Sequence, residues 1–133
     1  MIGLGQTAAE AFGQAATGLF ALMADPAAVE ERDTREVRAH GRTPESLLRA
    51  WLSECLYVLE VEGFAARRVE WVFFSLEAAA GGEPLRLHAR LHGEETDPAR
   101  HTSAGTMSGV SAEGASFGQS SGLFEARAVV NVY

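Results

Sequence analysis

The chain has 133 residues, of which 47% are hydrophobic, enough for one globular domain with a buried core. Its formal net charge is −7 and it contains no lysine, which argues against free-standing nucleic-acid binding and excludes lysine-based covalent catalysis. Cys55 is the single cysteine, so no intrachain disulfide can form. No apolar run reaches the roughly 20 residues that cross a bilayer and no signal peptide is recognisable, so we predict a cytoplasmic protein.

A first amphipathic helix is predicted over residues 7–24. Its apolar residues recur at helical spacing and form one stripe. Thr7 and Glu10 have the spacing of a capping box, and residues 25–26, Asp-Pro, end the helix because proline disfavours helical geometry in the residue before it.

A second helix is predicted over residues 44–62. Thr43 is a natural N-cap, Pro44 fits the first helical position and Gly63 ends the helix. Its apolar stripe consists of Leu48, Trp51, Leu52, Cys55, Leu56 and Leu59. Cys55, Trp51 and Tyr57 are therefore expected in the core, and Cys55 is not expected to be a nucleophile.

Strand patterns occupy most of the remaining chain. Residues 29–40 are polar and suit an edge strand, residues 69–76 are aromatic and aliphatic, and residues 85–92 and 124–132 alternate between apolar and polar side chains. Residues 80–84 predict a turn, and the Gly- and Ser-rich residues 111–122 predict a mobile loop. The fold class is α+β: a mainly antiparallel sheet with two helices packed on one face, in a single domain spanning residues 1–133.

Two patterns suggest catalysis or metal binding but have simpler explanations. Residues 114–118 and 118–122 both match the G-x-S-x-G nucleophile elbow, which must join a strand to a helix, whereas here both lie in the predicted loop. His88 and His92 lie on one face of a strand, but roughly 13 Å apart, too far to share a metal ion. We interpret that face, with its arginines, as solvent-exposed.

Six segments in order resemble the archease family. Residues 5–12, GQTAAEAF, are similar to its opening "G-x-T-x-x-x-A-F" helix, and residues 19–23 to the end of that helix. Residues 47–57, LLRAWLSECLY, resemble the family's "LLxxWLxELLY" helix, and residues 82–84 and 97–101 its turns. Residues 129–132, VVNV, match the closing "V-V-D-V". The resemblance covers nearly the whole chain, through the order and spacing of these segments.

The resemblance implies the archease fold and a role as an accessory protein, not an enzyme. Archeases assist the GTP-dependent RNA ligase of tRNA splicing and RNA repair by promoting its guanylylation and turnover. Members carry a divalent metal site, usually calcium, formed by an aspartate of an N-terminal "H-T-A-D" motif, the closing aspartate and a terminal backbone oxygen. In this chain that site would correspond to Asn131 and Val132.

The chain departs from the family pattern at its metal site. Met1 stands where the first aspartate is expected, the "H-T-A-D" strand is absent, and Asn131 replaces the closing aspartate. Ser108 and Glu113 occupy the positions of a family lysine and histidine. Because calcium requires anionic oxygens, we expect this degenerate site to bind calcium weakly or not at all.

Two functions follow from these observations. The first is an archease-type accessory protein that binds an RNA ligase protein. The alternative is a divergent protein-binding module of the same fold that uses no metal and does not activate a ligase; a hydrolase using a loop serine is remote. The missing strand also predicts an exposed sheet edge, for which the closing strand is the candidate, and self-association into a homodimer.

Overall fold

The computed structural model describes residues 2–21, 26–76, 84–96 and 107–132; for residues 26, 107–114, 120 and 130–132 the description covers the backbone alone. The elements follow one another as β1 (Ile2–Gly5), α1 (Ala8–Ala21), the 3₁₀ turn η1 (Pro26–Ala28), β2 (Asp33–Gly41), α2 (Pro44–Glu60), β3 (Phe64–Ser75), β4 (Leu85–Glu95), β5 (Met107–Ser120) and β6 (Leu123–Val132). In the described residues neither helix combines the length and the apolar character that crossing a membrane requires.

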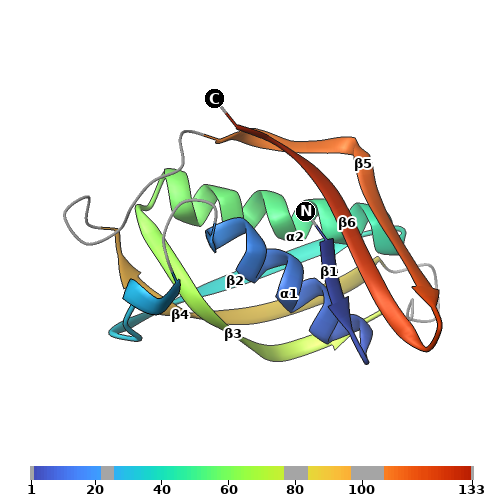
Figure 1. The fold of residues 1–133 in the computed structure, drawn as a ribbon, viewed down its shortest axis with the longest axis horizontal. Helices are drawn as coiled ribbons and strands as arrows, with labels where there is room; N and C mark the ends of the chain where they lie inside the picture. Colours follow the sequence, from blue (N-terminus) through green and yellow to red (C-terminus); the bar gives the residue numbers. More distant parts are fainter. Residues whose placement is uncertain (1, 22–25, 77–83, 97–106, 133) are drawn as a thin grey trace.

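The strands form two antiparallel sheets of three strands each. One sheet has the order β1-β6-β5 and the other the order β2-β4-β3. Helices α1 and α2 lie between the two sheets in Figure 1, and both contact strands of each. The α+β class and the antiparallel pairing are confirmed, but the sequence does not predict the division into two sheets.

The helix starts agree with their capping signals. The backbone N–H of Ser46 donates to Thr43 Oγ1 (3.1 Å) and the N–H of Thr43 donates to Ser46 Oγ (3.0 Å), which is a complete capping box. At α1 the N–H of Glu10 donates to Thr7 Oγ1 (3.1 Å). Side-chain acceptors thus satisfy backbone donors that a helix start leaves unpaired.

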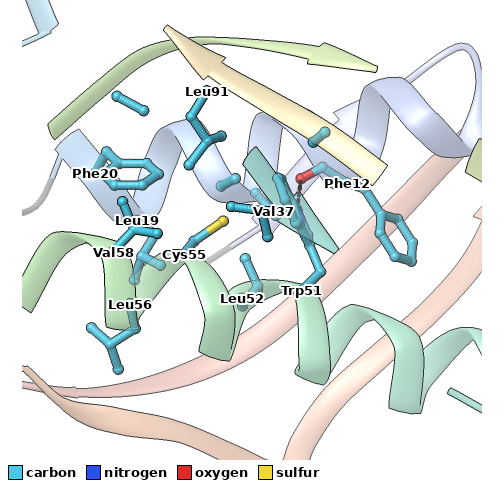
Figure 2. Close-up of a cluster of buried hydrophobic side chains, with 14 of the residues drawn as sticks. Phe12, Leu19, Phe20, Val37, Trp51, Leu52, Cys55, Leu56, Val58 and Leu91 are labelled. Carbon is cyan, nitrogen blue, oxygen red and sulfur yellow. Dashed lines mark hydrogen bonds between the residues drawn. The ribbon is translucent and has the colours of Figure 1, made fainter. Parts of the chain in front are cut away.

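The core lies where the helices meet the inner faces of the sheets. Figure 2 shows Phe12, Leu19 and Phe20 of α1 packed with side chains of α2 and with Leu91 of β4. The core residues that α2 buries are Leu47, Leu48, Trp51, Leu52, Cys55, Leu56, Val58 and Leu59. Burial raises the pKa of the Cys55 thiol well above its usual range, so this cysteine is a core residue, as predicted. The prediction that Tyr57 belongs to the core is wrong, because its side chain is 54% exposed.

The prediction of a mobile loop over residues 111–122 is also wrong. Strand β5 continues to Ser120, and Ser121 and Gly122 form a two-residue turn into β6. Both turn residues have positive φ, 53° and 81°, the combination found in tight hairpin turns whose twist matches that of the strands. A Gly- and Ser-rich composition therefore marks a paired strand here, because β6 supplies the hydrogen bonds.

Strand positions within the sheets decide two further predictions. Strand β2 is an edge strand, as its polar sequence predicts. The closing strand β6 is the central strand of its sheet, flanked by β1 and β5, so its assignment as the exposed edge is corrected. The physical reason is that β1, which the sequence does not predict, pairs with Phe124–Arg127 of β6.

Candidate functional site

Strand β1 is fixed in place by backbone packing against α1. A Cβ atom added at Gly3 would lie 2.2 Å from the carbonyl oxygen of Ala11, so only glycine allows this close approach. Ile2 pairs with Arg127 and Gly5 with Phe124. Because the pairing is antiparallel, the Ile2 end of β1 points toward the Asn131 end of β6.

The predicted metal residues lie at that end of β6. Asn131 pairs with Gly109 of β5, and Val132 pairs with Met107. The ladder is irregular between Met107 and Gly109, which places Ser108 in a bulge directly opposite these two residues. We call this region, residues 107–110 and 131–132, the β5–β6 corner. The topology thus brings Ser108 and Asn131 together, although they are 23 positions apart in the sequence.

Glu113 does not join the β5–β6 corner directly. It lies in a second irregularity of β5, between Ser111, which pairs with Val129, and Ser116, which pairs with Arg127. The backbone therefore places Glu113 further along the sheet, away from the Asn131 end. Met1 lies outside the described residues.

The oxygens available at the β5–β6 corner are neutral. Residues 107–110 and 131–132 offer backbone carbonyls, the amide of Asn131 and the hydroxyl of Ser108, and they include no carboxylate. This donor set does not fit calcium, which prefers several anionic oxygens. In the part of the chain that the structure describes, no three histidine, cysteine or acidic residues are grouped to hold a metal.

Neither G-x-S-x-G match forms a nucleophile elbow. Residues 114–118 lie within β5, and residues 118–122 span the end of β5 and the hairpin turn. The element that follows this turn is strand β6 and not a helix. The required strand-to-helix turn is therefore missing at both matches.

A ladder of charged side chains crosses the outer face of the β2-β4-β3 sheet. Nε2 of His88 lies 2.8 Å from Glu36 Oε2, and Arg90 reaches both Glu36 (3.0 Å) and Glu70 (3.6 Å). Nε2 of His92 lies 2.7 Å from Glu70 Oε1. Each histidine thus contacts a different carboxylate, Glu36 for His88 and Glu70 for His92. We call these five residues the charged ladder.

The hydrogen bonds of the charged ladder lower the pKa of both of its carboxyl groups. The hydrogen bond to His88, with a second from Arg90, lowers the pKa of Glu36. The hydrogen bond to His92 does the same to the pKa of Glu70. The alternation of β4 predicts the exposed face, but only the strand register brings Glu36 and Glu70 to opposite sides of Arg90.

Sequence comparison decides the family. Residues 1–132 match the sequence model of the Archease protein family (MTH1598/TM1083). The chain belongs to the archease family. The archease of Pyrococcus abyssi is 34% identical to it over 99 residues, which cover 74% of this chain and 66% of the relative. The archease of Methanosarcina mazei is 30% identical over 128 residues, covering 96% of this chain and 85% of the relative.

Solved structures have the same fold. The solution structure of Methanobacterium thermoautotrophicum protein 1598 superposes with a TM-score of 0.73 at 23% identity, covering 99% of this chain and 89% of that one. A Thermotoga maritima archease, described as a possible chaperone, superposes with a TM-score of 0.54 at 12% identity, covering 99% and 88%. The match to the Pyrococcus abyssi archease spans just under two thirds of that relative's length.

Proposed function

We propose that this archease-family chain is an accessory protein of a GTP-dependent RNA ligase, whose guanylylation and turnover it promotes. The observation that carries the proposal is the family match over residues 1–132, with a fold that superposes on solved members. The ligase role itself is what the family resemblance implies.

The chain is proposed to act through protein contact and not as an enzyme. Its one cysteine is buried with a raised pKa, and its G-x-S-x-G matches lie in a β-hairpin. A net charge of −7 disfavours direct RNA binding, so the partner is the ligase protein. The lone cysteine suits a reducing compartment, and we place the protein in the cytoplasm.

A guanylylation assay tests this function. The RNA ligase of the same organism is incubated with labelled GTP, with and without the chain, and the covalent ligase–GMP adduct is quantified over time. We expect faster guanylylation and several rounds of RNA joining when the chain is present. Unchanged rates, at concentrations where both proteins are folded, would contradict the proposal.

The second candidate function is a binding module without metal or ligase activation. The neutral donor set of the β5–β6 corner favours it, because the family resemblance implies two aspartate ligands, and Asn131 stands in place of the one on the closing strand. The result that selects it is co-purification with the ligase without any stimulation. An Asn131→Asp variant refines the test, with Gln119→Glu, an exposed site on β5, as the control that adds the same charge. Stimulation regained only by Asn131→Asp would assign the lost activity to the corner.

A further inference from the structure

We propose that a hollow on the outer face of the β2-β4-β3 sheet binds a short acidic segment of a partner protein, one that carries an aromatic or aliphatic side chain beside its carboxylates. The hollow has a volume of about 490 Å³ and is lined by Arg38, Ala39, His40, Phe73, Pro84, Arg86, Leu87 and His88. It lies on the opposite sheet from the β5–β6 corner, so the proposal stands whether or not the partner is a ligase.

The strand register gathers its basic side chains. Arg38 pairs with His88, and the next outward pair along β2 and β4 is His40 with Arg86. Four basic or titratable side chains thus project from the ends of two neighbouring strands. No carboxylate is found among the described residues that line the hollow. On a chain with a net charge of −7, this is a local concentration of the opposite sign.

A β-bulge adds an aromatic side chain. The β3–β4 register is shifted between Trp71 and Phe73, so Trp71 pairs with Ala89 while Phe73 pairs with His88. Trp71 and Phe74 pack toward the core, whereas Val72 and Phe73 are 48% and 53% exposed. A bulge re-aims side chains in this way, and here it turns a phenylalanine outward beside the arginines.

Some of the basic side chains at the hollow already have a carboxylate partner and others do not. Among the side chains that line the hollow, His88 is already paired with Glu36, whereas Glu70 is bound by Arg90 and His92, which lie outside the hollow. The side chains of Arg38 and His40 form no ion pair or hydrogen bond with another described residue. An arginine guanidinium with no such partner can bind a carboxylate through two parallel hydrogen bonds.

The dimensions and charges favour a peptide over a nucleic acid. Arg38 on β2 and Phe73 on β3 flank β4, so they are about 10 Å apart, a width that one extended peptide can bridge. A polyanionic RNA would extend past the hollow onto a surface that contains Glu36 and Glu70 and belongs to an acidic protein, which opposes binding. A segment with only a few carboxylates avoids this repulsion.

The test uses fluorescence anisotropy with the intact chain and three probes. These are a labelled peptide with a phenylalanine flanked by aspartates and glutamates, the same peptide with asparagine and glutamine, and a labelled oligouridylate. The variants are Arg38→Glu and Phe73→Ser. Arg49→Glu on α2 makes the same charge change at another exposed site and is the matched control. Circular dichroism confirms that each variant is folded.

We expect saturable binding of the acidic peptide that weakens as salt is raised and is absent for the amide peptide. Arg38→Glu should weaken it about tenfold or more, Phe73→Ser should also weaken it, and Arg49→Glu should change it less than about twofold. Equal losses for Arg38→Glu and Arg49→Glu would mean a diffuse charge effect and overturn the site. Stronger, Arg38-dependent binding of oligouridylate, or no binding of the acidic peptide, would overturn the proposed occupant.

Discussion

The indole Nε1 of Trp51 on α2 donates a hydrogen bond to the backbone carbonyl of Phe12 on α1, at 3.0 Å and fully buried. Figure 2 shows this bond in the core. A second indole, that of Trp71 on β3, donates to the carbonyl of Ala9 at 3.0 Å in a half-buried position. The ring centroids of Trp51 and Trp71 lie 5.0 Å apart. Together they connect α1 to α2 and to β3.

Replacing Trp51 tests the cost of losing the buried link. Trp51→Phe removes the donor and leaves space in a close-packed core, so we expect a loss of about 2–4 kcal/mol in the free energy of unfolding. Trp71→Phe, where water reaches the site, should cost at most about 1–2 kcal/mol. Urea denaturation followed by far-ultraviolet circular dichroism measures both. A smaller loss for Trp51→Phe than for Trp71→Phe would contradict this ranking.

The phase of α2 is tested at two positions three residues apart. Leu52 is fully buried and Arg49 is exposed. Leu52→Ala should cost about 2–5 kcal/mol because it opens a cavity beneath the helix, and Arg49→Ala under about 0.5 kcal/mol. Thermal and urea unfolding of both variants check the difference. Equal losses of unfolding free energy in the two variants would show that the apolar stripe of α2 is misassigned.

The charged ladder predicts a component of acid sensitivity. The pKa values of Glu36 and Glu70 are lowered from 4.5 in the folded state, chiefly by hydrogen bonds to His88 and His92. The stabilisation is therefore present above pH 4.5 and is lost as the pH falls through the folded pKa values. A Glu36→Gln, Glu70→Gln double variant should lose less stability on acidification than the wild type.

Urea midpoints measured from pH 6 to pH 3 would show this as a flatter profile for the double variant (roughly this range brackets the carboxyl titration). Glu54→Gln, at an exposed position on α2, is the control. A double variant with the unaltered wild-type slope would show that the ladder contributes nothing to pH-dependent stability.

We expect no tight calcium binding. The β5–β6 corner offers the amide of Asn131 where the family uses an aspartate, and neutral oxygens bind calcium weakly. Isothermal titration calorimetry should give no micromolar isotherm with the wild type, and Asn131→Asp should bind calcium more strongly. A clear micromolar isotherm for the wild type would refute the interpretation of a degenerate site.

Self-association stays a prediction, with its location revised. Strand β1 pairs with Phe124–Arg127, so among the described residues no strand pairs with residues 129–132 of β6 on that side. Unpaired backbone groups favour pairing with a second copy, so we expect a two-fold dimer at micromolar concentration.

Sedimentation velocity tests the dimer with two matched variants. Val129→Asp alters an exposed valine beside the open part of β6, whereas Val72→Asp alters a similarly exposed valine on β3 (52% and 48%). The first should shift the protein toward monomer and the second should not. A wild-type protein that stays monomeric at high concentration would contradict the predicted dimer.

The sequence alone determined the parts of the fold that depend on local signals. Helices α1 and α2 follow from apolar stripes and from Thr7 and Thr43 as caps, because a helix satisfies its hydrogen bonds within itself. The alternation of β4 likewise predicts its buried and exposed faces. The family resemblance also came from local segments, above all residues 47–57.

Tertiary structure decided what depends on partners distant in sequence. Strand β1 has four residues and β5 is rich in glycine and serine, and both are strands because β6 provides their hydrogen bonds. The same pairing makes β6 a central strand and brings Ser108 to Asn131. The charged ladder and the exposed Phe73 result from register and from a bulge, which shift whole sets of side chains and leave no mark in local composition.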